Sequence, residues 1–268
     1  MATAEVTLPS GVWRENARHR SAGLRWPAEA DERALVEETA GLLPAARVTE
    51  LISRCVEIGG AAGDDVAREL TAGDRVALLL ELRRLACGEA LVCVFPCPNP
   101  DCGEQLELEL RVSDLLVEPA REPAPVHDLR LGEEVVRFRL PTGADEERAA
   151  VRALDDPQAA VEELLAACLV EAPEPSPPEL RERIAEAMAE LDPQADLTLA
   201  LRCPECEREG VVAFDAAAYL FDELGARTQA LERDVHVLAS GYGWSEDEIL
   251  ALPPARRRRY VERLEDVG

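Results

Sequence analysis

Four of the eight cysteines lie in two pairs, and each pair occupies a short turn that contains proline. The first turn is in the segment FPCPNPDCG and the second is in LRCPECERE. Such a turn presents two thiolates on one side while its backbone amides point at the sulfurs, so two turns supply the four ligands of a tetrahedral zinc ion. We therefore predict a split four-cysteine zinc ribbon that binds one structural Zn²⁺ through Cys97, Cys102, Cys203 and Cys206.

Two alternatives remain for these cysteines. All four could be reduced and packed, or Cys203 and Cys206 could form a redox pair, although no thioredoxin-like βαβ pattern surrounds them. Four thiolates leave no open position for water, so the spacing disfavours a catalytic zinc. Cys93 is the one conceivable spare ligand. The other cysteines are expected in the core or at a helix end: Cys55, Cys87 and Cys168.

The remaining reactive residues form no recognisable active site. The histidines His19, His127 and His236 are scattered and belong to no nucleophile or metal-ligand motif. All 29 basic residues are arginine, and the absence of lysine excludes a Walker phosphate loop, a Schiff-base lysine and a Ser-Lys hydrolase. We predict that the protein is not an enzyme.

The chain is strongly acidic. Its 268 residues carry 54 Asp and Glu against 29 Arg, which gives a net charge of −25. Nucleic acid and anionic membranes are themselves polyanions, so this charge disfavours both as main partners. No run approaches about 20 consecutive apolar residues, and the N-terminus lacks the basic and apolar regions of a secretory signal. We expect a protein of the reducing cytoplasm, with a substantial core because 47% of its residues are apolar.

The cysteines must be positioned by the helices and strands around them. The sequence pattern predicts an α+β fold that is mainly α-helical. Residues 1–92 are expected to form an irregular arm to about residue 30, followed by an N-terminal helical region. Thr71 can cap one of its helices, with Asp74 three residues later. Two segments show apolar residues at helical spacing: Val48, Leu51, Ile52, Cys55 and Val56, and Leu78, Leu79, Leu82, Leu85 and Ala86.

Residues 93–214 are expected to hold the two cysteine turns, with an acidic α/β region inserted between them at 103–202. Alternating apolar residues predict strands on both sides of each turn. The segment from 93 to 210 has 28 acidic and 11 basic residues, so −17 of the net charge lies there. Within the insertion we predict a strand pair around 135–140 and helices at about 144–154, 157–171 and 179–191.

Residues 215–268 are expected to form a long helix and a C-terminal helical unit. Ser245 and Glu248 match a capping box, and Arg256–Arg259 is the only basic cluster, most simply part of a solvated, partly salt-bridged helix. Aromatic and arginine residues are enriched at interface anchors. We predict that this unit contacts a second copy of the chain or another protein, although Trp244 could simply pack the turn onto the long helix. The predicted contact residues are Tyr242, Trp244, Leu250, Tyr260 and Leu264.

Several segments of the chain resemble the T4-like baseplate hub assembly family of contractile phages and phage-tail-derived injection systems. The segments are RVTELISRCVEIGG (47–60), LTAGDRVALLLELRRLACGE (70–89), RLPTGADEE (139–147) and YGWSEDEILALPPARRRRYVERL (242–264). Together they cover most of the chain beyond the N-terminal arm.

The resemblance implies a non-enzymatic chaperone that assembles a baseplate, with baseplate or tail proteins as partners. A second interpretation is a stoichiometric structural component of that baseplate. A third, weaker one is a zinc-ribbon adaptor for nucleic acid or protein.

Overall fold

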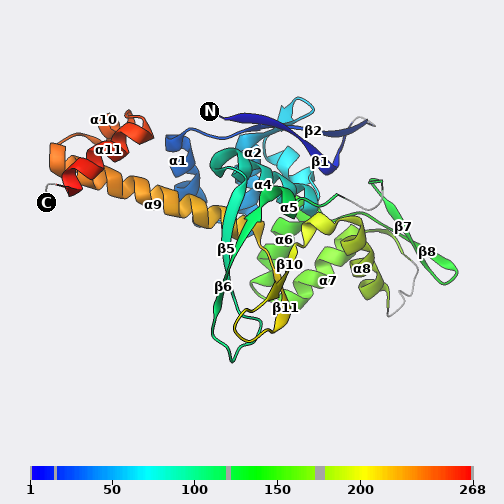
Figure 1. The fold of residues 1–268 in the computed structure, drawn as a ribbon. Helices are drawn as coiled ribbons and strands as arrows, with labels where there is room; N and C mark the ends of the chain where they lie inside the picture. The colour runs from blue at the N-terminus through cyan, green and yellow to red at the C-terminus, as the bar shows by residue number, and fades with distance from the viewer. Residues whose placement is uncertain (1, 15–16, 119–121, 173–178, 267–268) are drawn as a thin grey trace. The chain divides into compact units, whose positions relative to one another are not determined.

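The computed structural model describes residues 2–14, 17–118, 122–172 and 179–266. Helices and strands are both abundant, which confirms the α+β class (Figure 1). Two compact units are present: residues 1–26 with 41–218, and residues 27–40 with 219–268. Among the helices of the described segments, none is long and apolar enough to cross a membrane.

The N-terminal segment is a β-hairpin, so the predicted irregular arm is wrong. Leu8, Val12, Ala22 and Leu24 are buried on one face. The alternation of apolar and polar residues that is typical of a strand is interrupted, because the register of the hairpin shifts between Thr7 and Val12. The strands pair antiparallel in the order β1 (Thr3–Arg14), β2 (Ala17–Arg25), β3 (Val56–Ile58) and β4 (Ala61–Ala62).

Four helices pack against one another in the first unit, and three of them contact this sheet. Both helices predicted from apolar spacing are confirmed, and Val48, Leu51 and Ile52 are buried on the first of them. The Thr71 hydroxyl caps the second by accepting from the Asp74 amide at 3.2 Å. The four helices are α2 (Pro44–Cys55), α3 (Asp64–Glu69), α4 (Ala72–Cys87) and α6 (Gly143–Ala153).

The N-termini of α4 and α6 meet directly. Thr71 and Thr142 form an isolated antiparallel bridge. The Ala72 amide donates to the Pro141 carbonyl, and the Gly143 amide donates to the Leu70 carbonyl, each at 3.0 Å. Two helix N-termini placed together concentrate positive partial charge, which buried carboxylates can offset. The carboxylates at this place are Asp74, Asp145 and Asp192.

Asp74 joins the N-terminus of α4 to the β1–β2 hairpin. Its carboxylate accepts from the amides of Ser10 and Gly11, both at 2.7 Å, instead of closing a capping box with Thr71. Asp192 accepts from the Gly73 amide at 2.9 Å and lies so close that a Cβ on Gly73 would be 1.8 Å from its Oδ1. Single carboxylates therefore connect α4 to Gly11, which lies 63 positions before Asp74, and to Asp192, which lies 119 positions after Gly73.

The unfolding free energy should depend on the ionisation of Asp74. Burial raises the pKa of Asp74 from 3.8 to about 6, against the hydrogen bond from Ser10, and nearby Asp192 raises it further. A carboxyl whose folded-state pKa is raised contributes stability below the unfolded-state pKa and loses it as pH rises through the folded-state pKa. We expect a loss of about 2 to 3 kcal/mol between about pH 4 and pH 7.

Asp74→Asn checks this prediction because asparagine resembles the protonated carboxyl and does not titrate. Urea unfolding of both proteins at the two pH values should show the difference between them shifting in favour of the variant as pH rises. A constant difference would contradict the assignment of this pH dependence to Asp74.

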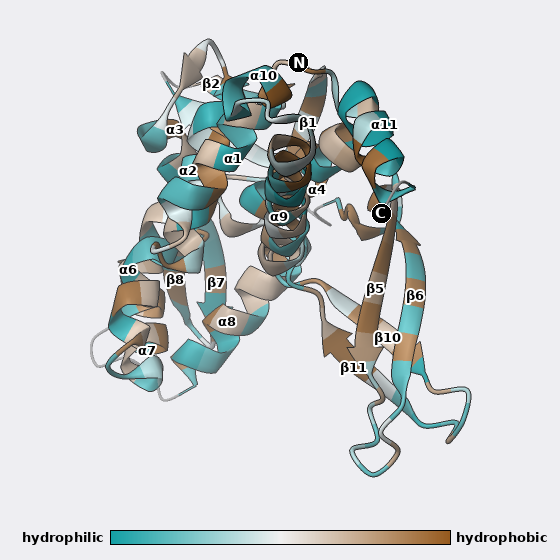
Figure 2. Ribbon diagram, turned by 90° about the vertical axis from the view of Figure 1, so that its left-hand side faces the viewer, coloured by the Kyte–Doolittle hydropathy of each residue, from teal (hydrophilic) through white to brown (hydrophobic). Residues whose placement is uncertain are grey.

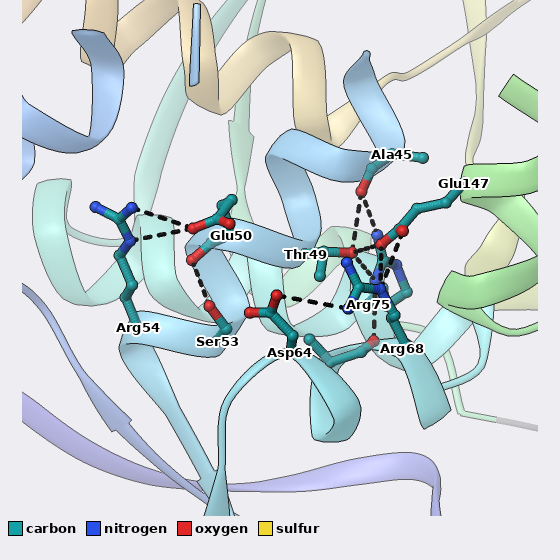
Figure 3. Close-up of polar contacts among 10 residues, drawn as sticks. Ala45, Thr49, Glu50, Ser53, Arg54, Asp64, Arg68, Arg75 and Glu147 are labelled. Atoms are coloured by element: carbon teal, nitrogen blue, oxygen red, sulfur yellow. Dashed lines mark hydrogen bonds and ion pairs between the residues drawn. The ribbon is translucent and has the colours of Figure 1, made fainter. Parts of the chain in front are cut away.

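A buried arginine organises the junction of α2, α3, α4 and α6. Arg75 is 2% exposed and donates to the carbonyls of Ala67 and Ala45 and to the Thr49 hydroxyl, at 2.9, 2.7 and 3.1 Å. Its Nε lies 2.8 Å from a Glu146 carboxylate oxygen. Figure 3 shows Ala45 and Thr49 beside Arg75, while Arg54, Glu50 and Ser53 lie farther along α2.

A second ion pair lies beside the first. Arg68 of α3 pairs with Glu147 of α6 at 3.0 Å, and Glu147 also accepts from Thr49. Gly143 leaves the space that Arg75 occupies, because a Cβ there would be 2.2 Å from Nη1. The junction therefore brings together residues from three of the segments that carry the sequence resemblance.

A second core forms within the insertion. The predicted strand pair and three helices are confirmed, except that the second helix ends at Cys168 and is followed by a third strand. The core contains Val136, Phe138, Leu140, Cys168, Leu180, Ile184 and Met188. The elements are β7 (His127–Leu131), β8 (Glu134–Phe138), α7 (Pro157–Cys168), β9 (Leu169–Glu171) and α8 (Leu180–Leu191), with the short α5 (Val112–Leu115) and η1 (Pro193–Ala195) nearby in sequence.

The second unit is helical. The predicted long helix and the Ser245–Glu248 capping box are confirmed. The helical region predicted after about residue 30 begins with the helix at residues 29–39, which belongs to this unit and not to the first. The helices are α1 (Glu29–Thr39), α9 (Ala216–Tyr242), of which residues 219–242 belong to this unit, α10 (Glu246–Leu250) and α11 (Pro254–Glu265).

Candidate metal centre and partner surface

Two β-hairpins carry the paired cysteines. Both hairpins have continuous antiparallel register, and they lie side by side in Figures 1 and 2. Leu106 and Leu201 are buried between them, with Phe95, Leu108 and Leu199 packed around. The strands are β5 (Ala90–Pro96) with β6 (Gln105–Arg111), and β10 (Thr198–Arg202) with β11 (Glu209–Ala213).

The four predicted ligands come together at the tips of these hairpins. All four Sγ atoms lie within 4.8 Å of one another. The Sγ–Sγ distance is 3.6 Å from Cys97 to Cys206 and 3.9 Å from Cys102 to Cys203. Thiolates at 2.3 Å from a tetrahedral ion would be separated by about 3.8 Å, so the spacing fits one metal ion.

Each turn is shaped by its backbone. The Cys97 amide donates to the Glu104 carbonyl at 2.8 Å, and the Cys203 amide donates to the Arg208 carbonyl at 3.0 Å. The Asn99 amide points at the Cys97 sulfur at 3.3 Å. The hairpins touch where a Cβ on Gly210 would lie 2.5 Å from the Pro98 side chain. Glycine at position 210 thus permits the close approach of the two turns.

The four thiols differ in their tendency to ionise. Burial raises the pKa of Cys97 to about 12, whereas the hydrogen bond from the Arg208 amide lowers the pKa of Cys206 to about 7. Four adjacent thiolates would repel one another, so full deprotonation of the group requires a cation. The donor set therefore suits a divalent ion that favours sulfur.

The other cysteines lie outside this group. Cys93 is buried on β5 and does not join the group of four sulfurs, so the structure gives it no ligand role. Cys55 and Cys168 are buried, as expected of core residues, and burial raises the pKa of each to about 11. Cys87 is exposed at the end of α4.

Three of the five predicted contact residues form one aromatic cluster in the second unit. Tyr242 stacks on Trp244 with ring centroids 4.7 Å apart, and Tyr260 meets both rings edge-on. Tyr242 is 38% exposed, while Trp244 and Tyr260 are partly exposed. Leu264 packs against Gly241, where a Cβ would be 2.4 Å from Cδ1, and Leu250 lies on α10. A role of these residues in binding a partner stays a prediction.

The arginine cluster divides into exposed and buried members. Arg257 is 3% exposed and pairs with Glu29 of α1 and Asp234 of α9, while the other three arginines are exposed, which confirms the predicted solvated, partly salt-bridged helix. Arg256 and Arg263 lie over the Tyr260 ring, and the hydrogen bond from Arg256 lowers the pKa of Tyr260. The spacing gave no signal for Arg257, because its partners are 228 and 23 positions away.

Comparison with known proteins gives one family. The family described as T4 bacteriophage base plate protein matches residues 34–174. No match was found among curated proteins or among solved structures.

Proposed function

We propose a role in baseplate assembly for this chain because it belongs to the T4 bacteriophage base plate protein family. The match spans more than half of the chain and includes α2, α4 and α6, which meet at the junction around Arg75. Membership associates the chain with phage baseplates and with other baseplate proteins as partners. The finer proposal is an assembly factor that covers partner surfaces and then leaves.

The acidic charge supports a factor that stays soluble before it meets its partner. Mass spectrometry of the lysate and of purified particles tests this proposal. An assembly factor is present in the lysate and absent from mature particles. A fixed ratio to known baseplate proteins in the particles would contradict it and favour the second candidate, a stoichiometric structural component.

We further propose that Cys97, Cys102, Cys203 and Cys206 hold one structural zinc ion. Four cysteine sulfurs at this spacing suit zinc, which prefers tetrahedral thiolate ligands. Such an ion would join hairpins that are 109 residues apart at Cys97 and Cys206. Elemental analysis of protein purified without chelator should give one zinc per chain, and a value well below one would contradict the proposal.

We propose that the chain catalyses no reaction. A four-thiolate site leaves a metal ion no open position for water or substrate, which supports this proposal. Reproducible turnover that a single point substitution abolishes would contradict it.

We propose the aromatic cluster of the second unit as the surface that contacts a baseplate protein. Half-exposed aromatic rings beside arginines have the composition of interface anchors. The exposed Tyr242 is the best position for a test, because truncation would also remove the ion pairs of Arg257. Tyr242→Ala should abolish capture of the baseplate partner, whereas Leu154→Ala, at a 70% exposed position of the first unit, should retain it.

Thermal unfolding of both variants provides the control. If Tyr242→Ala unfolds the second unit, the cluster is core structure; if capture is unchanged, the surface lies elsewhere. Either result would contradict the proposed contact.

A further inference from the structure

The first unit carries a groove of about 750 Å³ that the cysteine cluster and the family match do not explain. It runs along the β1–β4 sheet and the end of α2. Small residues leave the space open: a Cβ on Gly23 would meet only the Glu57 carbonyl oxygen, at 3.8 Å, and one on Gly60 would meet nothing within 4 Å. This volume is in the range of sites that hold a ligand or a short peptide segment.

The charge of the groove is opposite to that of the chain. Its lining includes four arginines and a single acidic residue, Glu57, in a protein of net charge −25. Low-dielectric walls strengthen the field of charges gathered in a concave site. The groove is therefore a local site for anions on an acidic protein. The four arginines are Arg18, Arg20, Arg25 and Arg54.

Two of these arginines are neutralised and two are not. Arg18 pairs with Glu122 at 2.5 Å, and Arg54 pairs with Glu50 at 3.1 Å. Arg25 donates to the Arg54 carbonyl at 3.0 Å, and Arg20 donates to the Leu8 carbonyl at 2.8 Å. Within the described residues, neither Arg20 nor Arg25 contacts a carboxylate.

Arg25 is the member best placed to bind a ligand. Its side chain is anchored at one nitrogen by the Arg54 carbonyl, in the last turn of α2, which leaves the other guanidinium N–H groups without a protein acceptor in the described chain. A guanidinium held in this way can receive a carboxylate through two parallel hydrogen bonds. The anchoring also lowers the entropy lost on binding.

The lining favours a carboxylate ligand over nucleic acid. The residues that line the groove include no Phe, Tyr or Trp, and their one ring, the imidazole of His19, lies against Gly59, where a Cβ would be 2.8 Å from Nδ1, so bases would have little surface on which to stack. A nucleic acid strand would also extend its phosphate charge beyond the groove onto an acidic surface, whereas a short peptide keeps its charges inside. The strong negative charge of the chain likewise disfavours a second copy as the occupant.

We propose that this groove binds an extended segment rich in glutamate or aspartate that belongs to a partner protein. The segment lies over β2, its carboxylates pair with Arg25, and Glu57 disfavours an acidic residue at the position next to it. This site is separate from the C-terminal aromatic cluster. Its test needs only the purified chain, so its failure would leave the proposed baseplate role unaffected.

Fluorescence anisotropy with labelled hexaglutamate provides the test, with hexaglutamine and a thymidine hexanucleotide as competing probes. At about 50 mM salt we expect hexaglutamate to bind the full-length chain, more weakly as salt rises, and hexaglutamine not to bind. Arg25→Glu should weaken binding at least about tenfold. Gly23→Val, which fills the groove without changing charge, should also weaken it, and Glu57→Gln should strengthen it.

Arg130→Glu is the matched control, because it makes the same charge change at an exposed position on β7 outside the groove. It should alter hexaglutamate affinity less than about twofold. Absence of binding, or equal losses in Arg25→Glu and Arg130→Glu, would overturn the proposal. Equal or tighter binding of the hexanucleotide at the groove would also overturn it. Sedimentation that shows self-association abolished by Arg25→Glu would identify a second copy as the occupant instead.

Discussion

Cys203→Ser is expected to abolish binding of the zinc ion that we propose and to disorder the two hairpins that carry the cysteines. Cys203 is fully buried among the four sulfurs, and serine is a poor zinc ligand. A structural zinc site contributes on the order of 10 kcal/mol in small peptides. Two-stranded hairpins are marginal without support, and the core between these two contains few buried residues.

The loss should stay within the hairpins. Hydrogen exchange should become fast in residues 90–111 and 198–213, while α4 remains protected, because the junction around Arg75 does not involve the cysteines. Addition of a strong chelator to the unmodified protein should produce the same pattern. Cys87→Ser, at an exposed cysteine outside the group, should keep both the metal and the protection. A Cys203→Ser protein with one zinc per chain and slow exchange would show that the prediction is wrong.

Arg75→Ala should destabilise the first unit by about 3 to 5 kcal/mol, a large part of the stability of an ordinary domain. The substitution leaves Glu146 without its partner, and burial already raises the pKa of that glutamate. It also removes the donor to the carbonyls of Ala45 and Ala67. Unpaired buried groups cost far more than the net gain of a formed hydrogen bond.

Arg68→Ala is a closely matched comparison. Both arginines pair with adjacent glutamates of α6, but Arg68 is 40% exposed and Arg75 is 2% exposed. An exposed ion pair contributes about 1 kcal/mol or less. Urea unfolding followed by circular dichroism should separate the two variants clearly. Equal losses of unfolding free energy in the two variants would mean that burial of Arg75 does not determine its contribution to stability.

Local pattern was sufficient for much of the helical and hairpin structure. The helices with regular apolar spacing, such as α2 and α4, were predicted because each helix buries residues that recur within a few positions. The Ser245–Glu248 capping box was predicted because its two hydrogen bonds join residues three positions apart. The cysteine turns were predicted for the same reason, since the two cysteines of each pair lie within one turn.

The groove and the junction had no comparable signal in the sequence. The arginines of β2 attract notice only once β1, β3 and α2 surround them, and the strand itself was missed because its partner changes register between Thr7 and Val12. Arg257 likewise resembles its exposed neighbours until α1 and α9 place Glu29 and Asp234 around it.

Asp74 illustrates which contacts could be predicted from the sequence and which could not. The sequence alone determined that Thr71 caps α4, because the hydroxyl and the amide that it accepts from are three residues apart. Only the tertiary structure decided that the Asp74 carboxylate turns away from this cap and binds the amides of Ser10 and Gly11, 64 and 63 positions away. Short-range spacing encodes contacts within one turn, whereas contacts across the fold depend on which buried groups remain without a partner once the elements have packed.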